Sequence, residues 1–325
     1  MSLTSVGQDV FLSKEKFELG RNFANKIWNA SRFVLMNLKP ENIKVDLCEF
    51  YSKENLGLPE RWILSKFYSL VKNLNSAYEN FRFNEAANLL YEFFWHDFCD
   101  WYVEITKQNI ENKATQVVLY KILEKFLRLL HPLMPFITEE IWHQLPHAEG
   151  FIMNQAWPHI QEQIIDKSAE TTMENLFEIT SAIRNLKADL GLQQAKNLKA
   201  LIFSLDKDME KVFTDFNPHI TKLAAVDSLQ ISYSKDKPKH SAVAVLKSCE
   251  ICLPLEGVVD FALQAKKIEE KLKFLENDLN SRKRKLENKD FVEHAPKEVV
   301  EKEKSRLEET REMITKLKKV KDALR

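Results

Sequence analysis

Residues 14–145 carry apolar side chains at helical spacing in four long segments. In each segment they recur every three or four residues, which places them on one face of a helix. Stripes this dense predict an all-helical bundle with one contiguous core. The first stripe consists of Phe23, Ile27, Ala30 and Val34.

Prolines mark the limits of these segments. Pro40, Pro59 and Pro146 stand between segments, where loops are expected. Pro132 and Pro135 lie inside the last segment. They should break or kink its helix, because proline lacks the amide hydrogen that a helix interior needs.

The pattern changes after residue 168. One helix is expected from Ala169 to Leu190, ending near Gly191, and another around Asp206 to Phe216. Apolar runs typical of β-strands occupy residues 197–205, 227–234 and 240–257. Helices mixed with strands on this scale predict a small α/β domain.

The last part of the chain repeats apolar residues in alternating steps of four and three. Such a repeat is typical of a coiled coil. The first run is Ile268, Leu272, Leu275, Leu279 and Leu286, with Arg282 at one seam position. The second run is Val300, Leu307, Thr310, Ile314, Leu317 and Leu324. A turn at residues 291–296 joins them, which predicts an antiparallel hairpin arm about 40 Å long.

These patterns predict a mainly α chain of four parts. They are a helical-bundle domain at 8–148, a linker at 149–167, a small α/β domain at 168–260 and a coiled-coil arm at 261–325.

Composition narrows the possible functions. The chain has six glycines, and no two of them form a GxG pair, which excludes a glycine-rich phosphate loop of the Rossmann or P-loop kind. Lys and Arg (48) balance Asp and Glu (48) overall. Cations are nevertheless in surplus after residue 266, which points to nucleic acid or another acidic partner.

The cysteines and histidines give little sign of a metal site. The four cysteines come without a secretory signal, which indicates a reducing compartment. No apolar run is long enough to span a membrane.

Cys249 and Cys252 form a CxxC pair inside an expected strand, without two further ligands of suitable spacing. Pro146 separates His143 from His147 and interrupts helical spacing. We therefore expect strand cysteines and surface or packing histidines.

An acidic cluster could suggest acid–base catalysis. Asp97, Asp100 and Glu104, near Trp95 and His96, fall on one face of a regular α-helix. No nucleophile or phosphate-binding loop accompanies them. Hydrogen bonding between helices is the better interpretation.

The first helix carries a second, polar stripe beside its apolar one. Asparagine is a mediocre helix former, so its repetition here has a local cost. An aromatic ring among amides and cations suits a splayed RNA base, although helix–helix packing also explains such a stripe. The stripe consists of Asn22, Lys26, Asn29 and Phe33, flanked by Asn25 and Arg32.

The arm carries four consecutive cations, residues 282–285. They form either a solvated surface or a contact with phosphates that is independent of sequence and sensitive to salt. On the second run of the hairpin the same patch would be widened by Lys297, Lys302, Lys304 and Arg306.

Longer stretches resemble a known family. RNFANKIWNASRFVL, FFWHDFCDWYVEITK and LLHPLMPFITEEIW are similar to the anticodon-binding helical domain of class I aminoacyl-tRNA synthetases. The GQD near the start and the tail KDFVEHAPKEVVEKEKSRL most resemble the valine-specific branch of that family, whose bacterial-type members carry such an arm.

The resemblance implies roles for individual residues. Phe33 matches the aromatic that stacks on the central anticodon base, here of tRNA(Val). A further basic contact of the family aligns with Glu15, which has Lys14 and Lys16 on either side, and Lys16 is taken as the candidate. Lys26 and Arg32 match nearby contacts of the family, with Asn29 as a further candidate beside them. Asn22 and Asn25 are anticodon candidates from the polar stripe itself.

On the arm, the residues that match the family's contact with the tRNA elbow are Arg282, Lys283, Arg284, Lys285 and Arg306. Lys304 is added from the basic patch of the arm.

The resemblance also implies what lies elsewhere. The family's HIGH and KMSKS signatures do not occur in this sequence. We therefore expect the C-terminal portion of a longer ligase, inactive alone, with ATP and valine bound outside it. We expect no catalytic residue, cofactor or metal in the chain, no DNA or membrane partner, a monomeric full-length enzyme and a cytoplasmic location.

Two other interpretations stay open. The chain could be a structural module whose hairpin docks partner helices, for which exposed apolar residues on the arm would be the sign. It could also be the isoleucine- or leucine-specific relative, against which the tail of the chain argues.

Overall fold

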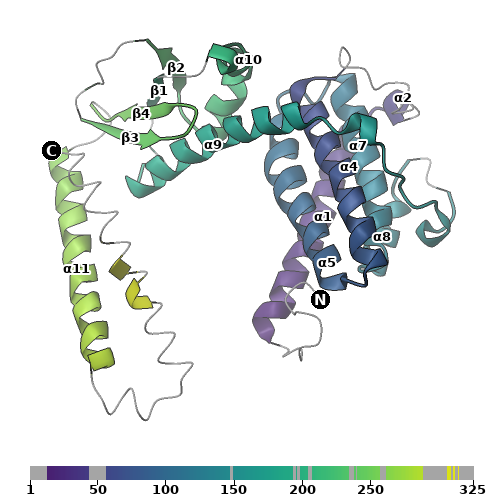
Figure 1. Cartoon of the computed structure of the whole chain (residues 1–325), viewed down its shortest axis with the longest axis horizontal. Helices are drawn as coiled ribbons and strands as arrows, with labels where there is room; N and C mark the ends of the chain where they lie inside the picture. The colour runs from purple at the N-terminus through teal and green to yellow at the C-terminus, as the bar shows by residue number, and fades with distance from the viewer. Residues whose placement is uncertain are drawn as a thin grey trace. The chain divides into compact units, whose positions relative to one another are not determined.

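The computed structural model describes residues 13–43, 56–146, 149–192, 195, 198–203, 207–233, 238, 240–256, 261–287, 306–308, 310–311 and 314. The chain divides into two compact units, with the division between Glu174 and Asn175. Figure 1 shows the helices of the first unit in purple to teal and the sheet of the second unit in green.

The first unit is a helical bundle, as the apolar stripes predicted. It contains α1 (Lys14–Asn37), α2 (Pro40–Ile43), α4 (Leu58–Glu79), α5 (Phe83–Glu92), the π-helix η1 (Phe93–Val103), α6 (Glu104–Thr106), α7 (Lys113–Leu130) and α8 (Pro135–Trp142). Two short 3-10 helices follow, η2 (Ile152–Asn154) and η3 (Glu162–Ile164). Helix α9 (Lys167–Asp189) begins in this unit and continues into the second one.

Local chemistry sets the ends of these helices. Asn112 caps α7 by accepting a hydrogen bond from the Ala114 amide at 2.8 Å. Helix α7 ends at Leu130, and α8 starts with Pro135 in its first turn, where a missing amide hydrogen does no harm. The predicted break in this segment is confirmed.

The core of the bundle is rich in aromatic rings. Phe94 is fully buried, and its ring centroid lies 4.5 Å from that of Phe126 and 5.2 Å from that of Phe98, in stacked arrangements. These geometries are favourable beyond the area they bury. The predicted stripe of α1 is buried as well: Phe23, Ile27, Ala30 and Val34.

The π-helix η1 departs from the regular helix that the sequence suggested. Its buried residues come in pairs, Phe93–Phe94, Phe98–Cys99 and Tyr102–Val103, which recur every four to five residues. That spacing exceeds the 3.6 residues of an α-helical turn and suits i→i+5 hydrogen bonding. The widened turn changes which side chains share a face of this segment.

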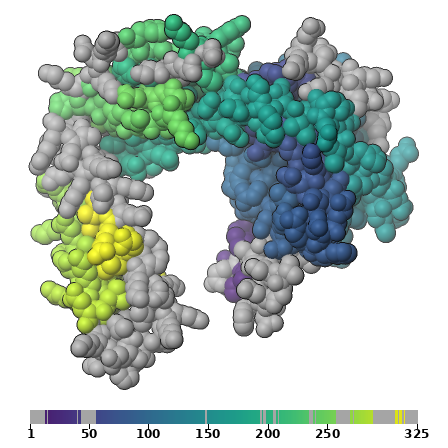
Figure 2. Space-filling model, in the orientation of Figure 1, coloured from purple at the N-terminus to yellow at the C-terminus, as the bar shows by residue number. Residues whose placement is uncertain are grey.

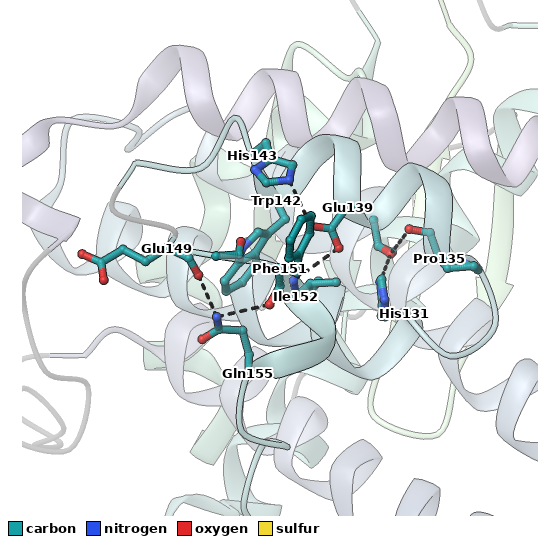
Figure 3. Close-up of polar contacts among 11 residues, drawn as sticks. His131, Pro135, Glu139, Trp142, His143, Glu149, Phe151, Ile152 and Gln155 are labelled. Carbon is teal, nitrogen blue, oxygen red and sulfur yellow. Dashed lines mark hydrogen bonds and ion pairs between the residues drawn. The ribbon is translucent and has the colours of Figure 1, made fainter.

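The chain after α8 folds back onto that helix (Figure 3). The carboxylate of Glu139 accepts a hydrogen bond from the Ile152 amide at 3.3 Å and pairs with Nε2 of His143 at 3.1 Å. The indole nitrogen of Trp142 donates to the carbonyl of Gly150 at 3.2 Å. His143 is therefore a surface and packing histidine, as predicted, while His147 lies outside the described residues.

The second unit contains a four-stranded sheet of order β2-β1-β4-β3. Its strands are β1 (Lys199–Phe203), β2 (Ser228–Ser232), β3 (Ser241–Val245) and β4 (Glu250–Pro254). Strands β1 and β2 pair in parallel, and β4 pairs antiparallel with both β1 and β3. The parallel pair is joined by α10 (Lys207–Ala224), which makes the expected α/β unit.

Two details of this unit differ from the sequence expectations. Helix α10 continues past Phe216 and through Pro218 to Ala224. It continues because Ile220 and Ala224 extend the buried side of the helix. The apolar run at 240–257 is a hairpin, which turns where the Leu246 amide bonds the Cys249 carbonyl at 2.9 Å.

The CxxC pair belongs to this hairpin. Cys252 is a residue of β4 and pairs in register with Leu201 and Val243. Cys249 comes just before the strand, so the expectation that both cysteines lie within it holds for Cys252 alone. Both thiols are buried, and burial raises the pKa of the Cys249 thiol.

The arm begins with the long helix α11 (Phe261–Glu287). Among its predicted seam positions Leu272 is buried, and Leu275, Leu279 and Leu286 are half-buried. Of the second run, residues 306–308, 310–311 and 314 are described and are helical, and Figures 1 and 2 place them beside α11. Thr310 and Ile314 are buried, as seam positions should be.

Candidate nucleic-acid interface

The polar stripe of α1 faces outward. Asn22, Asn25, Asn29 and Arg32 are exposed or half-buried, and Phe33 is half-buried. The stripe lies beside the buried residues that fix the helix in the bundle. The amides and the guanidinium are therefore available to a ligand on a rigid element.

Phe33 lies where the end of α1 meets the segment that follows α6. Its carbonyl accepts a hydrogen bond from the Asn37 side chain at 2.7 Å, in the last turn of α1. The ammonium of Lys107, which follows α6, lies over its ring at 5.9 Å from the centroid. The ring is thus neither sealed in the core nor isolated.

Lys26 is already engaged. Its ammonium lies 2.8 Å from a carboxylate oxygen of Asp100 and 5.1 Å from the centre of the Trp95 ring. The second carboxylate oxygen of Asp100 lies 3.2 Å from Nδ1 of His96. A ligand that binds Lys26 must compete with these partners.

Lys16 lies far from Phe33. The two residues are 17 positions apart on one helix, about 25 Å at 1.5 Å per residue. The first turns of α1, drawn in purple in Figure 1, extend beyond the neighbouring helices, and Phe17 and Leu19 are exposed there. Lys16 therefore lies apart from Phe33, although only six positions separate it from Asn22.

The segment between α6 and α7 borders this surface, and sequence reasoning missed it. Lys39, just after α1, forms an ion pair with Glu111 of this segment. The Lys39 amide also donates to the side chain of Gln116 at 2.9 Å. Residues 39 and 111 are far apart in the chain, and no periodicity along the sequence reveals that they meet.

The acidic cluster on η1 is used for packing. Asp97 lies 3.6 Å from Lys66 of α4, Asp100 pairs with Lys26 of α1, and Glu104 pairs with Lys107 at 2.6 Å. Each carboxylate thus reaches a different basic partner, Asp97 and Asp100 from η1 and Glu104 from α6. The predicted hydrogen bonding between helices accounts for Asp100, and an ion pair between helices accounts for Asp97.

Burial changes the titration of Asp97. Desolvation raises the pKa of this carboxyl to about 6, against the opposing attraction of the Lys66 ammonium. The Asp97 side chain lies between η1 and α4 of the bundle, beside Lys66.

The basic run lies in the last turns of α11, where positive side chains oppose the negative end of the helix dipole. Arg284 and Lys285 are at the surface, and Lys283 is half-buried. Arg282 is half-buried and bonds Asp278 through Nε at 2.7 Å, so it packs along its own helix. Arg306 is exposed, and Lys304 lies outside the described residues.

The described residues contain neither a cluster of metal-binding side chains nor a helix that could span a membrane. Within them, no group of three or more His, Cys, Asp or Glu side chains is placed to hold a metal ion. No described helix is long and apolar enough to cross a membrane.

Known families match two parts of the chain. Residues 60–202 match the family described as "Anticodon-binding domain of tRNA ligase". Residues 260–325 match the family described as "Valyl tRNA synthetase tRNA binding arm". The first match covers most of the bundle after α1, and the second covers α11 and the residues that follow it.

Curated relatives extend the similarity over nearly the whole chain. The valine–tRNA ligase of Syntrophotalea carbinolica is 37% identical over 323 residues, which cover 96% of this chain and 35% of that protein. That of Thermotoga maritima is 37% identical over 322 residues, covering 98% and 36%. The chain thus spans about a third of the length of these relatives.

A solved structure of the Agrobacterium radiobacter K84 LeuRS–tRNA–LeuAMS ternary complex is more distant. The match covers 76% of this chain and 26% of that one, at 12% identity and a TM-score of 0.39.

The two family matches and the curated relatives agree with the motifs of the sequence. The chain belongs to the valine–tRNA ligase family and corresponds to its anticodon-binding domain and its tRNA-binding arm.

Proposed function

We propose that this chain binds tRNA(Val) through two surfaces. The polar face of α1 binds the anticodon, and the arm binds the tRNA elbow. The observation that carries the proposal is the half-buried ring of Phe33 within an outward stripe of amides and cations. The family matches and the names of the relatives support it.

Phe33 is suited to hold an unpaired base. A base stacked on an aromatic side chain contributes about 1–3 kcal/mol to binding. Stacking alone does not distinguish bases, so the neighbouring polar groups must read their edges. Asn29 and Arg32 lie at the surface beside Phe33 and supply amide and guanidinium groups for that purpose.

The test is a titration of the whole chain with tRNA(Val). Phe33→Ala should weaken binding by about 1–3 kcal/mol. The same variant should also reduce the preference for tRNA(Val) over a transcript with a changed central anticodon base. Phe17→Ala is the matched control, because Phe17 is 63% exposed on the same helix but about four turns away. An equal weakening in both variants, or none in Phe33→Ala, would contradict the proposal.

We further propose that the longer protein joins valine to tRNA(Val) with ATP, as a monomer in the cytoplasm, and that this chain supplies binding alone. Its relatives are valine–tRNA ligases, of which the matched part is about a third. The purified chain, given ATP, valine and tRNA(Val), should form no valyl-tRNA. Product above the background of a tRNA-only sample would contradict this division of roles.

One observation favours a second function. Phe274 on α11 is 71% exposed, and an exposed apolar side chain on the arm is the sign expected of a protein-docking hairpin. If the arm serves a protein partner instead of tRNA, Phe274→Ser should leave the affinity for tRNA(Val) unchanged. Alanine substitutions of Arg284 and Lys285 on α11 should leave it unchanged as well.

A further inference from the structure

The segment between α6 and α7 is fixed against α1 at the level of Phe33. Its Lys107 ammonium lies over the Phe33 ring at 5.9 Å from the centroid. Its Glu111 pairs with Lys39 just beyond α1. Farther on, Gln116 accepts a hydrogen bond from the Lys39 amide at 2.9 Å. The segment therefore forms a second border of the Phe33 surface.

Lys107 is held there by a weak partner. Its ammonium lies 2.6 Å from a carboxylate oxygen of Glu104, and both side chains are 42% exposed. Ion pairs this accessible to water contribute little and exchange readily. The cation–π contact with Phe33 is also modest at an exposed position. Lys107 can therefore leave both partners when a stronger anion arrives.

A base that stacks on Phe33 brings such an anion with it. The Lys107 ammonium lies over one face of the ring. A base can stack on this face only when the ammonium moves aside, and the phosphate of the same nucleotide then arrives next to the displaced cation. A lysine serves well as a point charge for a phosphate.

We propose that Lys107 is the phosphate-binding partner of Phe33. It covers the ring in the absence of RNA and binds the phosphate of the stacked nucleotide in the complex. Glu104 holds the ammonium until then. This inference rests on the proposed role of Phe33. The experiment distinguishes a failure of the Lys107 role from a failure of the Phe33 role.

The experiment titrates the full chain with tRNA(Val) over a range of salt concentrations. Lys107→Ala should weaken binding roughly three- to tenfold at low salt. It should also lower the slope of log affinity against log salt by about 0.7, the value for one single-strand phosphate. The preference for the cognate central anticodon base should stay the same, because the lysine reads no base edge. Glu104→Gln should tighten binding roughly two- to fivefold, because it frees the ammonium.

Lys72→Ala is the matched control. Lys72 also pairs with one glutamate at the surface of the first unit, Glu162 at 3.0 Å, but on α4. Its removal should change neither the affinity nor the salt slope appreciably. A weakening equal to that of Lys107→Ala would show a general charge effect and overturn the inference.

A modified RNA tests the location. Replacing the phosphates that flank the central anticodon nucleotide by neutral methylphosphonates should weaken binding to the unmodified chain. The same replacement should have no further effect on Lys107→Ala. Additive effects would place the lysine elsewhere and overturn the inference.

The failures of the two proposals are distinguishable. If Phe33→Ala weakens binding and Lys107→Ala leaves affinity and salt slope unchanged, the role of Lys107 is wrong and anticodon binding stands. If Lys107→Ala tightens binding, the lysine merely obstructs the ring, which also overturns the inference. If Phe33→Ala has no effect, the proposed function itself fails.

Discussion

The ammonium of Lys26 on α1 lies 2.8 Å from the carboxylate of Asp100 on η1, although the two residues are 74 positions apart. Their side chains are 31% and 39% exposed. A lysine that the family resemblance assigns to tRNA thus has an intramolecular counterion at the edge of the same surface. If tRNA binds Lys26 as proposed, a phosphate replaces this carboxylate.

Asp100→Asn should therefore tighten the binding of tRNA(Val), by roughly two- to fivefold at low salt, because a partly exposed ion pair is weak and the freed Lys26 meets a phosphate. Titration of the variant and the unchanged chain measures the gain. In a Lys26→Ala background the same substitution should bring a much smaller gain. An equal gain in both backgrounds would mean that Asp100 acts only by general repulsion.

The surface cations of α11 should act through phosphates. Arg284→Ala with Lys285→Ala should weaken binding of tRNA(Val) and lower its salt slope by about 0.7–0.9 for each phosphate that is no longer neutralised. Arg282→Ala should change the slope less, because its guanidinium bonds Asp278. Titrations at several salt concentrations test this. An unchanged slope in the double variant would show that the basic run does not meet phosphates.

The aromatic core should determine the stability of the bundle. Phe94→Ala removes a fully buried ring stacked on Phe126 and Phe98, and should lower the free energy of unfolding by about 3–5 kcal/mol. Phe136→Ala is the control, because that ring is 90% exposed and its removal should cost less than about 0.5 kcal/mol. Urea unfolding followed by the tryptophan signal of the first unit measures both. Similar destabilisation in the two variants would contradict this core.

Asp97 should make stability depend on pH. Burial raises the pKa of its carboxyl from 3.8 to about 6 in the folded chain. Between these values the folded chain holds a proton that the unfolded chain has released. The contribution of this group to the free energy of unfolding therefore falls as pH rises through that window, and levels off above it.

Asp97→Asn removes this dependence. The free energy of unfolding of the variant, minus that of the unchanged chain, should increase from about pH 4 to about pH 6 and then stay constant. Urea unfolding at a series of pH values provides the comparison. A difference that is the same at every pH would show that Asp97 titrates normally in the folded chain.

The sequence alone predicted most of the helical architecture. The stripe from Phe23 to Val34 is buried because a period near 3.6 fixes which residues share a face of α1. The break at Pro135 followed from the chemistry of proline. The apolar pairs of η1 also carried a signal, since spacings of four to five residues are too wide for an α-helix. Interpreting them as a regular helix was the wrong choice of period.

The candidate site was only partly predictable in the same way. The outward polar stripe of α1 and the cations at the end of α11 are local properties, and the structure leaves several of them exposed. The family motifs assigned roles to individual residues of both surfaces. The partners of these residues could not be predicted, because a repeat along one segment does not say which distant segment packs against it.

By itself, then, the sequence determined the places of most helices and of the sheet segments, the family and the outward face of α1. These follow from short-range periodicity and from long motifs. Only the tertiary structure decided that Asp100 neutralises Lys26, that Lys107 covers Phe33, and that Asp97 is buried beside Lys66. The physical reason is that each of these depends on side chains from segments far apart in the chain, and on how much water is excluded where they meet.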